Sequence, residues 1–249
     1  MRGVHSARRL KAAVMRRLFG TVSHVVTTEN VVALTFDDGP DPVFTPYLLE
    51  LLAKYDARAT LFMIGQQVTR LQGTGSRLVE QAAQAGHAIA NHTYSHPCVP
   101  ALTTSQRRTE LLRCQAALEP YASGLFRPPK GLQSFRSYRD TRALGLKPIG
   151  WSAHAEDWEP HSAETFADRL QAEITNGSIV LLHDRIEGPR VPKVADRSQM
   201  LKGLECFLQK NTGRFRYVTV PQLFASGKHG LTNWFIPTEE HWPRAARYL

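Results

Sequence analysis

Short apolar runs alternate with longer segments of helical periodicity along most of this chain, from residue 30 onward. The first apolar run covers residues 31–36 and is followed by residues 45–55, where Leu48, Leu51 and Leu52 recur at helical spacing. The run indicates a strand and the spacing indicates an amphipathic helix. Because the two patterns recur in the same order, they predict parallel strands with helices packed outside them.

No low-complexity linker or internal repeat interrupts this series, so a single α/β domain is predicted over residues 30–228. The expected architecture is a distorted (β/α)7-type barrel with parallel strands, built from about seven strand and helix units. Further strands are expected at 59–64, 87–91, 125–127, 146–151, 178–183 and 216–220. Further helices are expected at 76–85, 106–118, 136–144, 163–176 and 198–210.

The composition is that of a globular protein, with 42% hydrophobic and 21% charged residues. These fractions exclude a disordered, collagen-like or coiled-coil chain. The cysteines Cys98, Cys114 and Cys206 show no C-x-x-C spacing, which argues against a disulfide scaffold and against a cysteine-based zinc site. No apolar run approaches the ~18 residues of a membrane-spanning helix, so none is expected.

The two ends of the chain differ from its middle. The formal net charge is +9, and six basic residues precede the first acidic residue, Glu29. Since Arg16 and Arg17 interrupt the apolar residues, a standard signal peptide is not expected, and the protein is predicted to be cytoplasmic. Residues 1–29 are predicted to be a basic helical extension, with an amphipathic helix over 6–26 that packs on the domain or touches an anionic membrane surface weakly. Residues 229–249 form an aromatic tail, which serves either packing or sugar stacking.

Polar residues follow several of the predicted strands at the point where each strand ends. Asp37 and Asp38 come after the first strand, and His92 and His96 come after the third. Each pair has an ordinary explanation, because Asp-Asp-Gly-Pro is also good turn chemistry and histidines four residues apart are often incidental. If the second segment takes one helical turn, however, both imidazole rings lie on one face, as metal ligands require.

Three later strand ends add Arg127, the neighbouring loop residues Asp157 and Trp158, and His183. Taken one at a time, these residues are consistent with an ordinary surface arginine, an ordinary loop and a histidine without a functional role. The carboxyl ends of parallel strands meet on one rim, however, and this is where such folds carry their active residues. Two histidines and one carboxylate make a three-ligand catalytic zinc site, and the remaining groups are suited to proton transfer and orientation.

Together these segments resemble, in order, the five motifs of the NodB-type polysaccharide deacetylases, carbohydrate esterase family four. The resemblance covers roughly residues 31–225 and rests on T-F-D-D-G-P at 35–40, H-T-Y-S-H at 92–96, R-P-P-K at 127–130, D-W at 157–158 and L-L-H at 181–183. It implies a distorted barrel and the metal-dependent removal of acetyl groups from N-acetylglucosamine units in chitin oligomers, peptidoglycan or related glycans.

The resemblance also implies the role of each residue in the reaction. Asp38, His92 and His96 would bind a divalent metal, most often zinc, with cobalt or manganese as alternatives. Asp37 would be the general base, and His183 would protonate the departing amine as an imidazolium.

Other matching residues would support these groups. Arg127 would orient Asp37, and Asp157 would stabilise the charged form of His183. The backbone N–H of Lys130 would hold the oxyanion. Trp158 and Leu181 would line the pocket for the acetyl methyl group.

Two departures from the family pattern bear on the substrate. Lys130 stands where an aromatic residue is usual, and His154 stands where an acid is common. The expected partner is an N-acetylated glycan, and no nucleic acid is expected. Two alternatives remain, a deacylase or deformylase of a nucleotide- or lipid-linked sugar, and a non-catalytic basic binding module suggested by the net charge.

Overall fold

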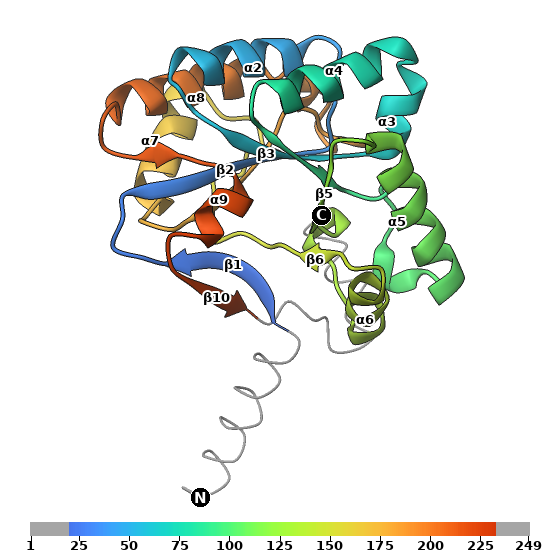
Figure 1. Cartoon of the computed structure of the whole chain (residues 1–249). Helices are drawn as coiled ribbons and strands as arrows, with labels where there is room; N and C mark the ends of the chain where they lie inside the picture. The colour runs from blue at the N-terminus through green and yellow to red at the C-terminus, as the bar shows by residue number, and fades with distance from the viewer. Residues whose placement is uncertain (1–19, 233–249) are drawn as a thin grey trace, which may run out of the picture.

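The computed structural model describes residues 20–232, most of which form a curled parallel sheet with helices on its outer face (Figure 1). Its strands follow the order β6-β5-β4-β3-β2-β8-β7, and neighbours pair in parallel. A further strand, β9, pairs with the start of β2. The strands are β2 (Val31–Asp37), β3 (Ala59–Met63), β4 (Ala88–Asn91), β5 (Ala122–Phe126), β6 (Lys147–Pro148), β7 (Ala153–His154), β8 (Ile179–His183) and β9 (Arg216–Tyr217).

Helices connect most of these strands, which confirms the predicted single α/β domain with a (β/α)7-type barrel. The longer helices are α2 (Phe44–Lys54), α4 (Gly73–Gln84), α5 (Thr104–Leu118), α6 (Phe135–Ala143), α7 (Ala163–Glu173) and α8 (Ser198–Lys210). The shorter ones are α3 (Gly65–Arg70), α9 (Val220–Phe224) and the 3-10 turns η1 (Val99–Ala101), η2 (Pro129–Gly131) and η3 (Pro192–Ala195). Within residues 20–232, no helix has the length and apolar character needed to cross a bilayer.

The central strand β2 is buried along its whole length, which explains its continuous apolar sequence. Phe36 belongs to the hydrophobic cluster that joins the sheet to α2, α7 and α8. Ala33 belongs to a second cluster, inside the curl of the sheet. Because side chains alternate along a strand, Thr35 and Asp37 continue the inner row and bring polar groups to the inside of the barrel at its carboxyl end.

The expected helix over residues 6–26 is wrong at its end, because Thr21–Val26 form strand β1. This strand pairs antiparallel with β10 (Lys228–Thr232) in a separate ribbon, and Val25 donates a hydrogen bond to the carbonyl of Gly177, just before β8. The ribbon therefore covers the amino ends of the strands, on the side opposite Asp37. The rest of that expected helix and most of the aromatic tail lie outside the described residues.

The sequence periodicity did not predict several short elements, namely α3, α9, β7, β1 and β10. The expected strand over 216–220 ends at Tyr217, because Thr219 and Gln222 form a capping box that begins α9. These elements are only a few residues long, so they show too few repeats to reveal a period.

Candidate active site

Adjacent aspartates stand at the carboxyl end of β2, where the backbone turns sharply. Asp38 adopts a left-handed φ of 73°, which aspartate tolerates better than most residues. At the next residue, Gly39, a Cβ atom would lie 2.5 Å from a carboxylate oxygen of Asp184. Only glycine fits this close approach, and the turn directs Asp37 and Asp38 to different neighbours.

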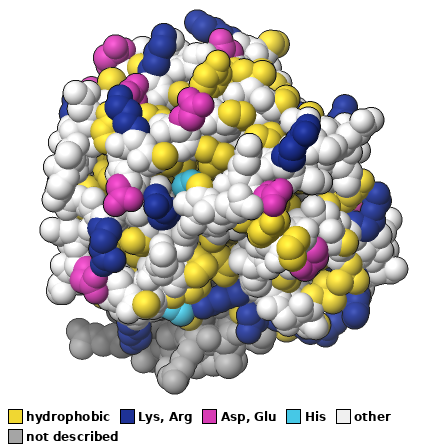
Figure 2. All heavy atoms as spheres, turned by 45° about the horizontal axis from the view of Figure 1, so that its top comes forward, with side chains coloured by type: hydrophobic (Ala, Val, Ile, Leu, Met, Phe, Trp, Pro, Cys, Tyr) yellow, Lys and Arg dark blue, Asp and Glu magenta, His cyan; other side chains and the backbone are white. Residues whose placement is uncertain are grey.

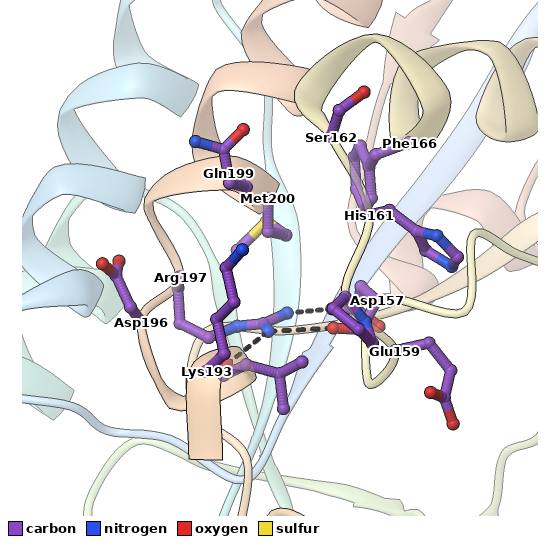
Figure 3. A pocket seen from close by; sticks show the side chains of 12 residues that line it. Asp157, Glu159, His161, Ser162, Phe166, Lys193, Asp196, Arg197, Gln199 and Met200 are labelled. Carbon is purple, nitrogen blue, oxygen red and sulfur yellow. Dashed lines mark hydrogen bonds and ion pairs between the residues drawn. The ribbon is translucent and has the colours of Figure 1, made fainter. Parts of the chain in front are cut away.

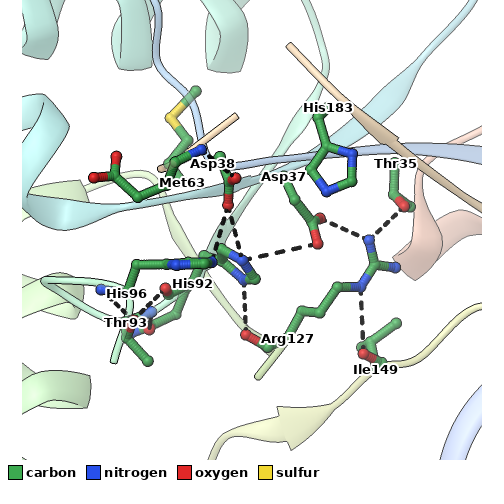
Figure 4. A network of polar contacts seen from close by, with 12 residues as sticks. Thr35, Asp37, Asp38, Met63, His92, Thr93, His96, Arg127, Ile149 and His183 are labelled. Atoms are coloured by element: carbon green, nitrogen blue, oxygen red, sulfur yellow. Dashed lines mark hydrogen bonds and ion pairs between the residues drawn. The ribbon is translucent and has the colours of Figure 1, made fainter. Parts of the chain in front are cut away.

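Asp38, His92 and His96 converge on one point (Figure 4). One carboxylate oxygen of Asp38, Oδ1, lies 3.2 Å from Nε2 of His92 and 3.2 Å from Nε2 of His96. Among residues 20–232, this trio is the group of histidine, cysteine and acidic side chains whose ligand atoms lie close enough together, within 4.8 Å, to share a metal ion.

The hydrogen bonding of His92 makes this cluster suitable for a cation. Its Nδ1 lies 2.8 Å from the carbonyl oxygen of Arg127, which only accepts, so Nδ1 carries the proton. In the neutral ring, Nε2 then presents a lone pair to Asp38. The Oδ1 atom of Asp38 is buried and has no hydrogen-bond partner within the described part of the chain. Convergent acceptor atoms of this kind fit a divalent metal.

The second oxygen of Asp38 accepts a hydrogen bond of 2.8 Å from the backbone N–H of Glu187. Burial alone would raise the pKa of Asp38, but the imidazole rings of His96 and His92 beside it hold that pKa well below its ordinary value. Asp38 is therefore ionised and ready to act as a ligand.

The segment that carries the two histidines is not the helical turn considered from the sequence. Residues 92–96 are irregular, and Thr93 and His96 adopt left-handed φ angles of 67° and 57°. The imidazole rings of His92 and His96 nevertheless lie 5.1 Å apart between centroids. The two rings therefore lie side by side, but a strained loop brings them together rather than helical spacing.

Arg127 is fully buried behind Asp37 and makes a short ion pair with it. One guanidinium nitrogen, Nη1, lies 2.7 Å from Oδ1 of Asp37 and 2.7 Å from Oγ1 of Thr35. The other, Nη2, donates to the carbonyl of Gly150 at 2.9 Å. Because these bonds occupy the fork of the guanidinium, the carboxylate of Asp37 has one preferred orientation, with its second oxygen 3.9 Å from Nε2 of His92.

On the neighbouring strand β8, His183 is held by Asp157. Nδ1 of His183 lies 2.9 Å from Oδ1 of Asp157, and its backbone N–H donates to Oδ2 at 2.8 Å. Burial alone would lower the pKa of His183, but the charge and hydrogen bond of Asp157, with smaller contributions from Asp38 and Asp37, raise it to about 9. At neutral pH the ring is therefore an imidazolium.

Asp157 has a second partner, Arg197, which the sequence analysis missed. Arg197 is buried, forms an ion pair with Oδ2 of Asp157, and donates to the carbonyls of Asp157 and Val194 at 2.9 Å each (Figure 3). Burial would raise the pKa of Asp157, but His183 and Arg197 lower it. Arg197 lies in a basic stretch with several other cations, so no sequence signal distinguishes it.

We expect the Asp157→Asn substitution to change the pH dependence of catalysis. In the wild type, the His183 ring loses its proton as pH rises through about 9. Removing the charge of Asp157 removes the largest of the interactions that raise the pKa of His183, so the alkaline limb of the plot of kcat against pH should move to lower pH if His183 is the proton donor. The measurement is kcat across pH 6 to ~10 at saturating zinc. An unchanged alkaline limb would contradict this assignment.

A pocket of about 340 Å³ lies over these groups and includes Asp37, Asp38, His92, His96 and His183 in its lining. The residues expected to contact substrate, Lys130, Trp158 and Leu181, also line it.

Arg127 and Asp157 stand behind the pocket wall, as supporting groups do. His154 lines the pocket too, with its ring 5.4 Å from that of Trp158, and Trp151 is a lining residue that the sequence analysis did not single out.

Comparison with known proteins agrees with this geometry. The family model described as polysaccharide deacetylase matches residues 24–149. A peptidoglycan-N-acetylglucosamine deacetylase of Bacillus cereus is 35% identical over 205 residues, which cover 80% of this chain and 90% of the relative. A chitooligosaccharide deacetylase of Azorhizobium caulinodans is 32% identical over 171 residues, covering 67% and 80% of the two chains.

The crystal structure of a peptidoglycan N-acetylglucosamine deacetylase has a similar fold, with a TM-score of 0.75 and 26% sequence identity. The match covers 87% of this chain and 98% of that one. It extends past the residues of the family model, which end before Asp157 and His183.

Proposed function

This chain belongs to the polysaccharide deacetylases of carbohydrate esterase family four, and we propose that it removes N-acetyl groups from N-acetylglucosamine units of an oligo- or polysaccharide in a metal-dependent reaction. As a member of this family it is a hydrolase of linear amide bonds. The observation that carries the proposal is one pocket that brings a three-ligand cluster together with a carboxylate, Asp37, and an imidazolium, His183.

Asp38, His92 and His96 would hold the metal. Two imidazole nitrogens and one carboxylate oxygen favour zinc, with room for water and substrate at the remaining positions. When bound, a divalent metal polarises the acetamide carbonyl and lowers the pKa of a water molecule.

Asp37 serves as the general base. Arg127 occupies one of its oxygens, which leaves the other, directed towards the metal cluster, to accept the proton of the attacking water. The two adjacent aspartates have different roles because they have different neighbours. Asp38 faces two imidazole rings, and Asp37 faces a guanidinium group.

His183 serves as the general acid. Its charged ring is stabilised by Asp157, which Arg197 holds in place, and it donates a proton to the amine nitrogen as the C–N bond breaks. An amine leaves poorly without this proton, so the raised pKa of His183 suits the reaction.

The remaining pocket residues suit an acetyl group. The backbone N–H of Lys130, in turn η2, would donate to the oxyanion. Trp158 and Leu181 offer apolar walls to the methyl group, and the Trp158 ring stands edge-on to the His183 ring at 5.9 Å.

The identity of the glycan rests on the relatives, which act on peptidoglycan and on chitooligosaccharide. Both contain N-acetylglucosamine units. Lys130 favours a second candidate, a nucleotide- or lipid-linked sugar, because its exposed ammonium group at the pocket could pair with a phosphate. On the face seen in Figure 2, positive and negative side chains are interspersed.

The test is acetate release from a short N-acetylglucosamine oligomer, measured before and after metal is stripped with a chelator and then restored. We expect stripping to abolish turnover and zinc to restore it, with cobalt as a second trial. Turnover that persists in metal-free protein would contradict the proposed chemistry. Zinc binding without turnover on this oligomer would redirect the substrate assignment to the phosphate-linked sugars.

A further inference from the structure

The loop that carries the ligand His96 is held in an unfavourable shape. Thr93 and His96 both have positive φ angles, a conformation that is unfavourable for residues other than glycine. A strained segment of this kind persists only where surrounding contacts determine it. The position of Nε2 of His96 therefore depends on whatever holds residues 93–96.

Part of that support comes from the backbone and from the loop itself. The N–H groups of Gly65 and Gln66, at the start of α3, donate to the carbonyls of Thr93 and Tyr94 at 3.1 and 2.8 Å. Within the loop, Oγ1 of Thr93 accepts a hydrogen bond of 3.1 Å from the N–H of His96. These bonds hold the backbone carbonyl groups of Thr93 and Tyr94 and the backbone N–H of His96.

The remaining backbone N–H groups, those of Tyr94 and Ser95, are held by one carboxylate, that of Glu110 on α5. Its Oε2 accepts hydrogen bonds from the backbone N–H groups of Tyr94, at 3.0 Å, and Ser95, at 2.8 Å. Its Oε1 accepts a third from Oγ of Ser95, at 2.9 Å. One turn further along α5, the guanidinium of Arg113 lies over the Tyr94 ring, 3.6 Å from its centroid.

Glu110 thus engages both of its oxygens with the two residues that immediately precede His96. We propose that Glu110 is a positioning residue for the metal site, which sets the affinity of the enzyme for its metal by holding His96 in place. This inference rests on the metal site of the proposed function. Glu110 itself does not line the substrate pocket.

Two properties of the carboxylate matter for this role. An ionised carboxylate accepts hydrogen bonds at both oxygens, and bonds from N–H groups to a charged acceptor are stronger than those to a neutral one. Alanine at position 110 removes all three bonds, whereas glutamine keeps one acceptor oxygen for the paired N–H groups. The two substitutions should therefore differ in degree.

The experiment measures the zinc Kd of the full chain by competition with a chelating dye. Groups that orient metal ligands change metal affinity by about 10- to 100-fold, and we expect Glu110→Ala to weaken zinc binding by that amount. Glu110→Gln should fall between it and the wild type. At zinc concentrations above the new Kd, the kcat of Glu110→Ala should return to near the wild-type value, because no reacting group has been lost.

A control is Glu80→Ala, which removes an exposed glutamate of α4 that accepts hydrogen bonds from Gln84, at 3.1 Å, and Tyr121, at 3.3 Å, away from the site. Its zinc Kd should equal that of the wild type. Circular dichroism melts of all the metal-free proteins verify folding. If Glu110→Ala does not fold, the milder Glu110→Gln decides the question through its Kd.

Wild-type zinc affinity in a folded Glu110→Ala protein would overturn the inference and leave the proposed function intact. A loss of rate that saturating zinc does not restore would also overturn it, because Glu110 would then act on something other than metal affinity. A wild type that binds no zinc would overturn the inference and the metal site together.

Discussion

Asp37→Asn is expected to lower the kcat of deacetylation by about 100- to 10,000-fold, the usual contribution of a general base. Asparagine has nearly the same shape, and its amide oxygen can still accept the hydrogen bond of Arg127, but it cannot take a proton from water. Zinc affinity should change little, because Asp38, His92 and His96, the proposed metal ligands, are untouched. The measurements are acetate release and zinc Kd on the same preparation.

Asp41→Asn is the matched control, since it makes the same chemical change in the turn that follows β2. Oδ1 of Asp41 accepts from the backbone N–H groups of Val43 and Phe44, at 2.8 and 2.9 Å, and an asparagine oxygen can do the same. This variant should keep wild-type turnover. An Asp37→Asn enzyme with a wild-type rate would show that another group is the base.

His183→Ala is expected to cause a loss of similar size, about 100- to 10,000-fold, but with a dependence on the leaving group. An amine must be protonated to leave, whereas a nitrophenolate leaves readily without a proton. The variant should therefore lose far more activity on the N-acetyl sugar than on 4-nitrophenyl acetate. The measurement is the ratio of kcat/KM values for the two substrates.

Asp37→Asn should lower both of these rates, because each reaction needs an activated water. His161→Ala, in the loop before α7, is a suitable control histidine outside the pocket that holds the ligand cluster and should leave both rates unchanged. Equal losses on amide and ester in His183→Ala would contradict the general-acid role.

Several features of the protein follow from local sequence alone. Apolar runs alternating with helical periods were enough to predict the parallel sheet, because strand and helix periods depend on residues close together in the chain. The rule that parallel strands carry their active groups at their carboxyl ends then located Asp37, Asp38, His92 and His183 on one rim, and the geometry agrees.

Other features depend on contacts between residues far apart in the chain, which no local pattern encodes. Arg197 meets Asp157 40 residues away, and β1 meets β10 across nearly the whole domain. The convergence of His92 and His96 is of the same kind. Their loop has left-handed backbone angles that periodicity does not predict, and it keeps them because α3 and Glu110 of α5 supply the hydrogen bonds that offset the strain.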